Sequence, residues 1–446
     1  MLKQITTMLW GNFTKSEKTK YGIASLLFFF IIGVYWAMRP LKDSIFMSMI
    51  GVQNIPLAKW ISLVVVIPLV MLYSKLLDVF PRHKMFYALS IIYGAAAILF
   101  GFLFMDPTIG LANTTVSATR WLGWAWYVYV ESFGSLMVAL FWAFMADTTT
   151  PESAKKGYFV LAMAGQVGGM IGSWYIAPLG LRFGTSSAPV IILLGFFVFL
   201  VVPIVYWFMQ AVPKDQLTGY QGKETTKQKH EGEEPGAFDG FRLMLTQPYL
   251  FGIFAVITIY EVVVTILDFQ FKMLVSNAYA SELQRSAYLG DFGGWTNFVA
   301  LVCLVLGVSN IQKKLGLSAS LALLPILVAV AVLTLRFNPI LAVAFWIMVL
   351  SKAFNYALNQ PSIQQLYIPT TKDAKYKAKA FIEMFGSRGS KAMGSGVNIL
   401  GKYMPLGQFL MVSSIASMGL ISVWFFVALY LGRTCTKAIV EKKVVC

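Results

Sequence analysis

Long apolar segments recur along the whole chain and are separated by shorter polar stretches. Because a helix needs about 20 mostly apolar residues to cross the hydrocarbon core of a bilayer, each segment is a candidate transmembrane helix. We expect twelve, at about residues 21–45, 57–78, 85–105, 120–146, 157–178, 188–210, 248–272, 290–309, 317–335, 338–366, 376–400 and 408–431. The pattern predicts an all-α polytopic membrane protein. We expect the first segment to stay as a span, since no small-residue cleavage site follows it.

The basic residues lie mainly in alternate loops. They cluster before the first predicted helix, after the second, fourth, sixth, eighth and tenth helices, and in the C-terminal tail. The loops on the other side carry about one each: Lys59, Arg120, Arg182, Arg285, Arg336 and Lys402. Since cytoplasmic loops are enriched in Lys and Arg, this distribution predicts that both termini are cytoplasmic.

Composition supports a membrane protein and removes other classes. The chain of 446 residues is 58% hydrophobic and only 13% charged, which is too apolar for an ordinary soluble protein. Its net charge of +16 is explained by the cytoplasmic loops, so we expect no nucleic-acid partner. Three cysteines and two histidines leave no disulfide framework and no histidine-rich metal site. We therefore expect no metal and no cofactor.

A polar segment near the middle divides the chain into two halves. Its run of Lys, Glu, Thr and Gln residues has no apolar period, which is typical of a solvated linker. We expect an N-terminal six-helix bundle over 1–212, a cytoplasmic linker over 213–240 and a C-terminal six-helix bundle over 241–446.

The two halves contain similar short motifs. Gly165-Gln-Val-Gly168 recurs as Gly386-Ser-Arg-Gly389, about 221 residues later, and a Gly-Ser pair at 172–173 recurs at 394–395. Two matched six-helix halves are typical of the major facilitator type of transporter, whose substrate site lies between the halves near the midplane. We therefore predict two pseudo-symmetric bundles of the major-facilitator-like class.

Ionisable residues inside the predicted spans are the candidate functional residues. Such residues are costly in a membrane unless they face a cavity or a partner. The candidates are Arg39 and Lys42 in the first helix, Glu131 in the fourth, Asp268 in the seventh, Lys352 in the tenth, and Arg388 and Lys391 in the eleventh. The excess of cations favours an anionic substrate. Lys42 and Lys391 are the strongest candidates, because both are expected to be deep and lie beside Pro or Gly.

Structural roles remain open for several of these residues. Arg39 can pair with Asp43, and Asp268 with Lys272, since each pair is spaced i,i+4 on one helix. Glu131 and Lys352 form either a salt bridge between the halves or part of the substrate site. Pro40 is expected to kink the first helix or to expose a backbone carbonyl.

Four segments of the chain resemble the nucleotide transporter family, the ATP/ADP translocases of plastids and intracellular bacteria. They are Tyr35 to Phe46, Tyr129 to Tyr158, Tyr260 to Lys272 and Tyr367 to Ser395. The family's Arg-x-x-Lys-Asp motif matches residues 39–43, its helix-4 Glu matches Glu131, and its last required Lys matches Lys391. Two positions depart from the family pattern: Asp268 stands where a Glu is usual, and Pro40 stands where an acid is usual.

The resemblance implies transport of nucleotides by alternating access, most simply ATP/ADP exchange with the phosphates held by lysines. It also implies a multi-pass protein of the bacterial inner membrane, with a lipid bilayer and a nucleotide as its partners, acting as a monomer. Proton-coupled nucleotide symport and a divergent carrier of another organic anion are the alternatives, and a non-transporting receptor or scaffold is a third. No nucleophile–base pair indicates catalysis, so we expect a transporter and not an enzyme.

Overall fold

The computed structural model describes residues 13–213, 217, 237–306, 309–371, 379, 382, 386–441 and 443–445, and within these ranges its regular elements are helical. Ten helical segments there are long and apolar enough to span a membrane. They are formed by α2 (Lys15–Met49), α3 (Ile55–Val79) with η1 (Val52–Asn54), α4 (Arg82–Met105), α5 (Trp121–Thr148), α6 (Pro151–Ile171) with η2 (Gly172–Ile176) and α7 (Leu179–Arg182), α8 (Ala188–Phe199) with α9 (Val201–Ala211), α12 (Pro248–Ala278), α13 (Glu282–Val305), α14 (Ser309–Phe337) and α19 (Leu406–Glu441).

The predicted polytopic all-α fold is confirmed, whereas the count of twelve spans remains a prediction. The predicted span at 338–366 is divided into α15 (Leu341–Phe354), the π-helical turn η4 (Asn355–Asn359) and α16 (Gln360–Leu366). The predicted span at 376–400 lies partly outside the described residues and ends in α18 (Ser387–Ile399) and η7 (Leu400–Lys402). A short helix, α11 (Ala237–Thr246), precedes α12.

The chain forms two compact units. Unit 1 contains residues 1–51, 64–230 and 281–301, and unit 2 contains residues 52–63, 231–280 and 302–446. The first two turns of α3 therefore belong to unit 2 and its remainder to unit 1, while most of α13 belongs to unit 1. The predicted boundaries of the two six-helix halves remain a prediction.

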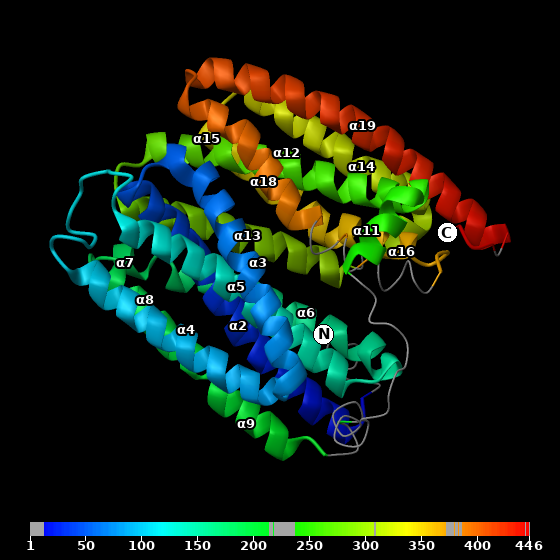
Figure 1. Ribbon diagram of the computed structural model, residues 1–446, viewed down its shortest axis with the longest axis horizontal. Helices are drawn as coiled ribbons and strands as arrows, with labels where there is room; N and C mark the ends of the chain where they lie inside the picture. The colour runs from blue at the N-terminus through cyan, green and yellow to red at the C-terminus, as the bar shows by residue number, and fades with distance from the viewer. Residues whose placement is uncertain are drawn as a thin grey trace. The chain divides into compact units, whose positions relative to one another are not determined.

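Helices pair in the same order within each unit. In unit 1, α2 packs mainly against α6 and α4 against α8, as Figure 1 shows. In unit 2, α12 packs against α18, and α14 packs against α19. Helices α14 and α19 run along one another in Figure 1. In terms of the predicted spans, helices 1 and 5 correspond to 7 and 11, and helices 3 and 6 correspond to 9 and 12. The shared pairing supports the interpretation of the sequence motifs as traces of a repeat.

Glycines explain the close packing of the first pair in each unit. A Cβ atom built on Gly172 would lie 2.0 Å from the carbonyl oxygen of Gly33, and one built on Gly168 would lie 2.4 Å from that of Phe29. In unit 2, a Cβ on Gly394 would lie 2.7 Å from the carbonyl oxygen of Val262. Gly172 and Gly394 are the glycines of the repeated Gly-Ser pair, so the motif brings two helix backbones into contact.

Pro40 interrupts the hydrogen bonds of α2 beside the candidate residues. Because proline has no N–H, it cannot donate to the carbonyl of Trp36, four residues earlier. That carbonyl instead accepts a hydrogen bond of 3.3 Å from the hydroxyl of Ser173, the second residue of the Gly-Ser pair. The expectation that Pro40 exposes a backbone carbonyl is confirmed, and a neighbouring segment satisfies it.

Candidate functional site

In unit 1, Lys42 is the centre of a buried charge cluster. Its side chain is only 5% exposed and its ammonium donates a hydrogen bond to Glu131 of α5. The same ammonium lies 3.6 Å from the carboxylate of Asp43 and 4.2 Å from the centre of the Tyr127 ring. Two carboxylates and an aromatic face therefore stabilise one buried cation.

Arg39 lies one turn earlier on α2 and stacks on aromatic rings. Its guanidinium carbon is 4.6 Å from the centre of the Trp36 ring and 5.8 Å from that of Tyr35. The expected i,i+4 partner of Arg39 was Asp43, which the structure pairs with Lys42. A planar guanidinium supported by aromatic faces is well suited to bidentate binding of an oxyanion.

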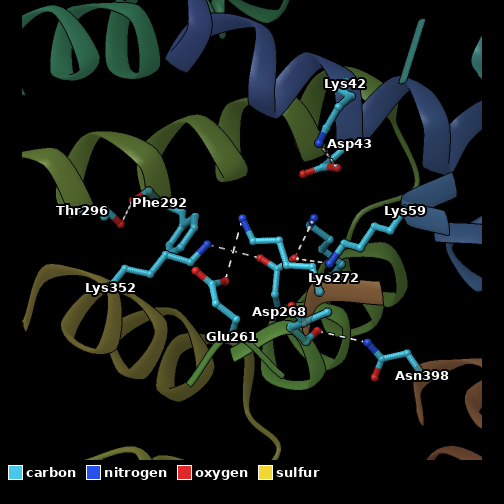
Figure 2. A network of polar contacts seen from close by, with 12 residues as sticks. Lys42, Asp43, Lys59, Glu261, Asp268, Lys272, Phe292, Thr296, Lys352 and Asn398 are labelled. Carbon is cyan, nitrogen blue, oxygen red and sulfur yellow. Dashed lines mark hydrogen bonds and ion pairs between the residues drawn. The ribbon is translucent and has the colours of Figure 1, made fainter. Parts of the chain in front are cut away.

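In unit 2, three lysines share the carboxylate of Asp268. The ammonium of Lys272 lies 2.9 Å from Oδ2, that of Lys352 3.3 Å from Oδ1, and that of Lys59 3.4 Å from Oδ2. All four side chains are at most 17% exposed. Figure 2 shows the three lysines reaching Asp268 from separate positions. The i,i+4 pairing of Asp268 with Lys272 predicted from sequence is confirmed.

Each lysine is placed by a different part of the fold. Lys272 lies one turn after Asp268 on α12, Lys352 lies in the last turn of α15, and Lys59 lies in the first turns of α3. The expectation that Lys59 is a loop residue was wrong. Hydropathy does not define the first residues of a helix, and Lys59 lies close to such an end. The contact of Lys59 with Asp268 has no local signal in the sequence, because the two residues are 209 positions apart.

A second pair of charges lies on α12 and α18. The ammonium of Lys391 is 3.8 Å from the carboxylate of Glu261, which is two turns before Asp268. The side chain of Lys391 is 52% exposed, so the expectation that this lysine is deeply enclosed was wrong. The side chain of Arg388 lies outside the described residues.

Five of the seven candidate residues thus lie in two clusters, one in each unit. Unit 1 brings together Arg39, Lys42 and Glu131 near the proline of α2. Unit 2 brings together Asp268 and Lys352, and adds Lys59 and Lys272. Glu131 pairs with Lys42, and Lys352 pairs with Asp268, so each has a partner within its own unit.

Each cluster places ammonium or guanidinium groups among membrane helices, where they can bind an anion. Removing a multiply charged anion from water is costly, and placed cations with exchangeable partners offset that cost. Carboxylates such as Glu131 and Asp268 can serve as counter-charges while no anion is bound. Both clusters have the composition of an oxyanion site, without a nucleophile and base arranged for catalysis.

Known membrane carriers match the chain over nearly its whole length. It is 24% identical to ADP,ATP carrier protein 1 of Chlamydia muridarum over 92% of the chain and 87% of that protein. It is 23% identical to ADP,ATP carrier protein 4 of Rickettsia bellii over 88% of the chain and 84% of that protein. The chloroplastic ADP,ATP carrier protein 1 of Arabidopsis thaliana is 25% identical over 89% of the chain and 70% of that protein.

Solved transporter structures share the fold. A bacterial homologue of the iron transporter ferroportin in the inward-facing state matches with a TM-score of 0.64 and 12% identity, over 94% of the chain and all of that structure. A peptide transporter in complex with sulfate matches with a TM-score of 0.60 and 13% identity, over 97% of the chain and 98% of that structure. These likenesses fix the major-facilitator-like fold alone. The model of the TLC ATP/ADP transporter family matches residues 1–435, and the chain therefore belongs to that family of membrane transporters.

Proposed function

We propose that this protein exchanges ATP for ADP across a membrane by alternating access. Family membership and the names of the similar carriers support the substrate class. The single observation of the site that carries the proposal is the pair of buried cation clusters around Lys42 and Asp268. Such clusters favour a substrate with several negative charges, as nucleotide phosphates have.

Within this proposal, cations of both units take part in holding the phosphates. Lys42 and Arg39 act from unit 1, and Lys352, Arg388 and Lys391 from unit 2. Glu131 and Asp268 act as counter-charges that the phosphates displace. Because both carboxylates are ion-pair partners of lysines, they suit exchange of one anion for another better than they suit proton carriage.

We further propose that the protein lies in the bacterial inner membrane as a monomer with both termini in the cytoplasm. The alternation of basic loops supports this orientation. The segment 213–240 is then a cytoplasmic linker between the two six-helix bundles.

Uptake of labelled ATP by cells that express the chain tests the proposal directly. We expect saturable uptake that unlabelled ADP inhibits more strongly than inorganic phosphate does. A carrier of another organic anion would give no ATP uptake above that of cells with an empty vector. In that case the nucleotide assignment would be rejected, although the transporter fold would stand.

Preloaded proteoliposomes distinguish exchange from proton symport. If the protein is an exchanger, ADP inside the vesicles should accelerate ATP entry, and dissipating a pH gradient should change little. The acceleration follows because the loaded carrier returns with a substrate in its site. Strong uptake into empty vesicles under an imposed pH gradient would instead identify a proton symporter.

A further inference from the structure

Asp268 is the carboxylate that Lys59, Lys272 and Lys352 share. Their ammonium groups lie 2.9–3.4 Å from its two oxygens, and Lys59 and Lys272 contact the same oxygen, Oδ2. One carboxylate carries one negative charge, so the three lysine ammonium groups share a single negative charge at Asp268. Like-charged ammonium groups brought this close repel one another unless an anion lies between them.

The three lysines reach this point from three helices, α3, α12 and α15. Lys59 lies near the start of α3, where a lysine side chain can extend along the helix to the polar interface. Its side chain instead is 17% exposed and directed at Asp268, as Figure 2 shows. Holding a flexible, strongly hydrated ammonium inside a helical unit is costly. Asp268 already has a local i,i+4 partner in Lys272, so neutralising this carboxylate does not require Lys59.

We propose that Lys59, Lys272 and Lys352 form a subsite for the terminal phosphate groups of the substrate, and that Asp268 is the anion that those phosphates displace. This inference rests on the proposed function and adds two lysines to its site. A phosphate group has several acceptor oxygens in a tetrahedral arrangement, so it can accept from three ammonium groups where a planar carboxylate shares two oxygens. Asp268 keeps the lysines together between binding events.

Inorganic tripolyphosphate is the probe that separates this subsite from the nucleotide assignment, because it has the phosphate chain without base or ribose. The measurement is the thermal unfolding of the purified full chain in detergent as tripolyphosphate is added. Lys59→Gln should raise the half-saturating concentration about tenfold to a hundredfold, as expected for loss of a charged hydrogen bond. Lys437→Gln is the matched control, because Lys437 is 77% exposed and pairs with Glu441 on the surface of α19.

Asp268→Asn gives the opposite expectation. Removing the competing negative charge should lower the half-saturating concentration of tripolyphosphate severalfold, while ATP exchange becomes slower because product phosphates leave less readily. A purely structural ion pair would behave differently. Lys59→Gln and Asp268→Asn would then lower the unfolding temperature alike, and both would weaken binding, which would overturn the subsite.

Two further outcomes separate the subsite from the proposed function. If tripolyphosphate stabilises the wild-type protein and Lys59→Gln weakens that effect, but no nucleotide is transported, the subsite stands and the ATP/ADP assignment fails. If the wild-type protein exchanges ATP and ADP but Lys59→Gln leaves tripolyphosphate binding and the KM for ATP unchanged, the assignment stands and the subsite is overturned.

Discussion

Lys42 and Lys391 differ in their surroundings although both match the sequence pattern of a phosphate-binding lysine. Lys42 is enclosed by Glu131, Asp43 and the ring of Tyr127. Lys391 is half exposed and lies 3.8 Å from Glu261. Neutralising Lys42 removes the cation that the buried Asp43 and the partly exposed Glu131 share, which is costly in itself. Neutralising Lys391 removes a charge from a more open position. The first change therefore affects both folding and transport, and the second affects mainly transport.

We expect Lys42→Gln and Lys391→Gln each to abolish ATP uptake while the protein still inserts. Lys→Arg at either position should restore little uptake, because a planar guanidinium does not replace a compact ammonium. The measurement is ATP uptake at matched membrane abundance, with Lys402→Gln as the control, since Lys402 ends η7 and is exposed. Near-normal uptake by both variants would remove these lysines from the site.

Asp106 stabilises the start of the loop between α4 and α5 by hydrogen bonds. Its Oδ1 accepts hydrogen bonds from the Thr108 hydroxyl at 2.6 Å, the Ile109 N–H at 3.0 Å and the Thr108 N–H at 2.8 Å. These bonds hold the pKa of Asp106 below its usual value of 3.8. A carboxyl whose pKa is lower in the folded state stabilises the fold above its unfolded pKa. That stabilisation is lost as the pH falls through the folded value.

Amide hydrogen exchange in this loop should therefore be faster below about pH 4 than its intrinsic pH dependence predicts. Asp106→Asn should show the faster exchange already at pH 7 and no further transition on acidification. Arg120, whose side chain donates to the carbonyls of Gly110, Asn113 and Thr115, should keep the rest of the loop in place. If the exchange of Asp106→Asn still accelerated on acidification as in the wild type, the transition would belong to another titrating group.

Individual helices show which parts of the structure local sequence can predict. The pairing of Asp268 with Lys272 follows from one turn of helix, and the freed carbonyl before Pro40 follows from the chemistry of proline. The approach of Lys59 to Asp268 does not, because it depends on the packing of α3 against elements far along the chain. The same holds for Glu131, whose predicted alternatives did not include the Lys42 that the fold brings to it.

The contact between α2 and the segment that follows α6 should be sensitive to a single methyl group. Gly172→Ala places a Cβ 2.0 Å from the carbonyl oxygen of Gly33, so the two backbones must separate. We expect a loss of about 1–3 kcal/mol in the free energy of unfolding, the usual cost of overpacking. Thermal unfolding in detergent measures it. Gly22→Ala on the same α2 is the matched control, since no atom lies within 4 Å of its added Cβ. Equal stability of the two variants would contradict this packing.

At the scale of the whole molecule, two units repeat one scheme of helix pairing, α2 with α6 and α4 with α8, then α12 with α18 and α14 with α19. Hydropathy alone predicted ten spans that are present, within the described residues, as helices of sufficient length, and the count of twelve stays a prediction. It could not predict that α15 gives way to a π-helical turn at Asn355–Asn359, because such turns arise from packing and not from apolar content.

A tag inserted in the linker at 213–240 should be accessible only from the cytoplasm. The reason is that an even number of spans separates the linker from the N-terminus in the proposed orientation. Labelling with a membrane-impermeant reagent in intact and in permeabilised cells measures this. Labelling in intact cells would contradict the topology and the assignment of the repeats.

The backbone contact at Gly33 and Gly172 also affects how a mutational tolerance map of this protein should be interpreted. Gly172 should reject nearly every substitution, because an added Cβ would lie 2.0 Å from the carbonyl oxygen of Gly33, although glycine has no side chain that could touch a ligand. A map based on uptake alone would therefore group Gly172 with the ligand-binding residues. Scoring membrane abundance beside uptake separates them, because loss of abundance accompanies the glycine variants and not Lys391→Gln.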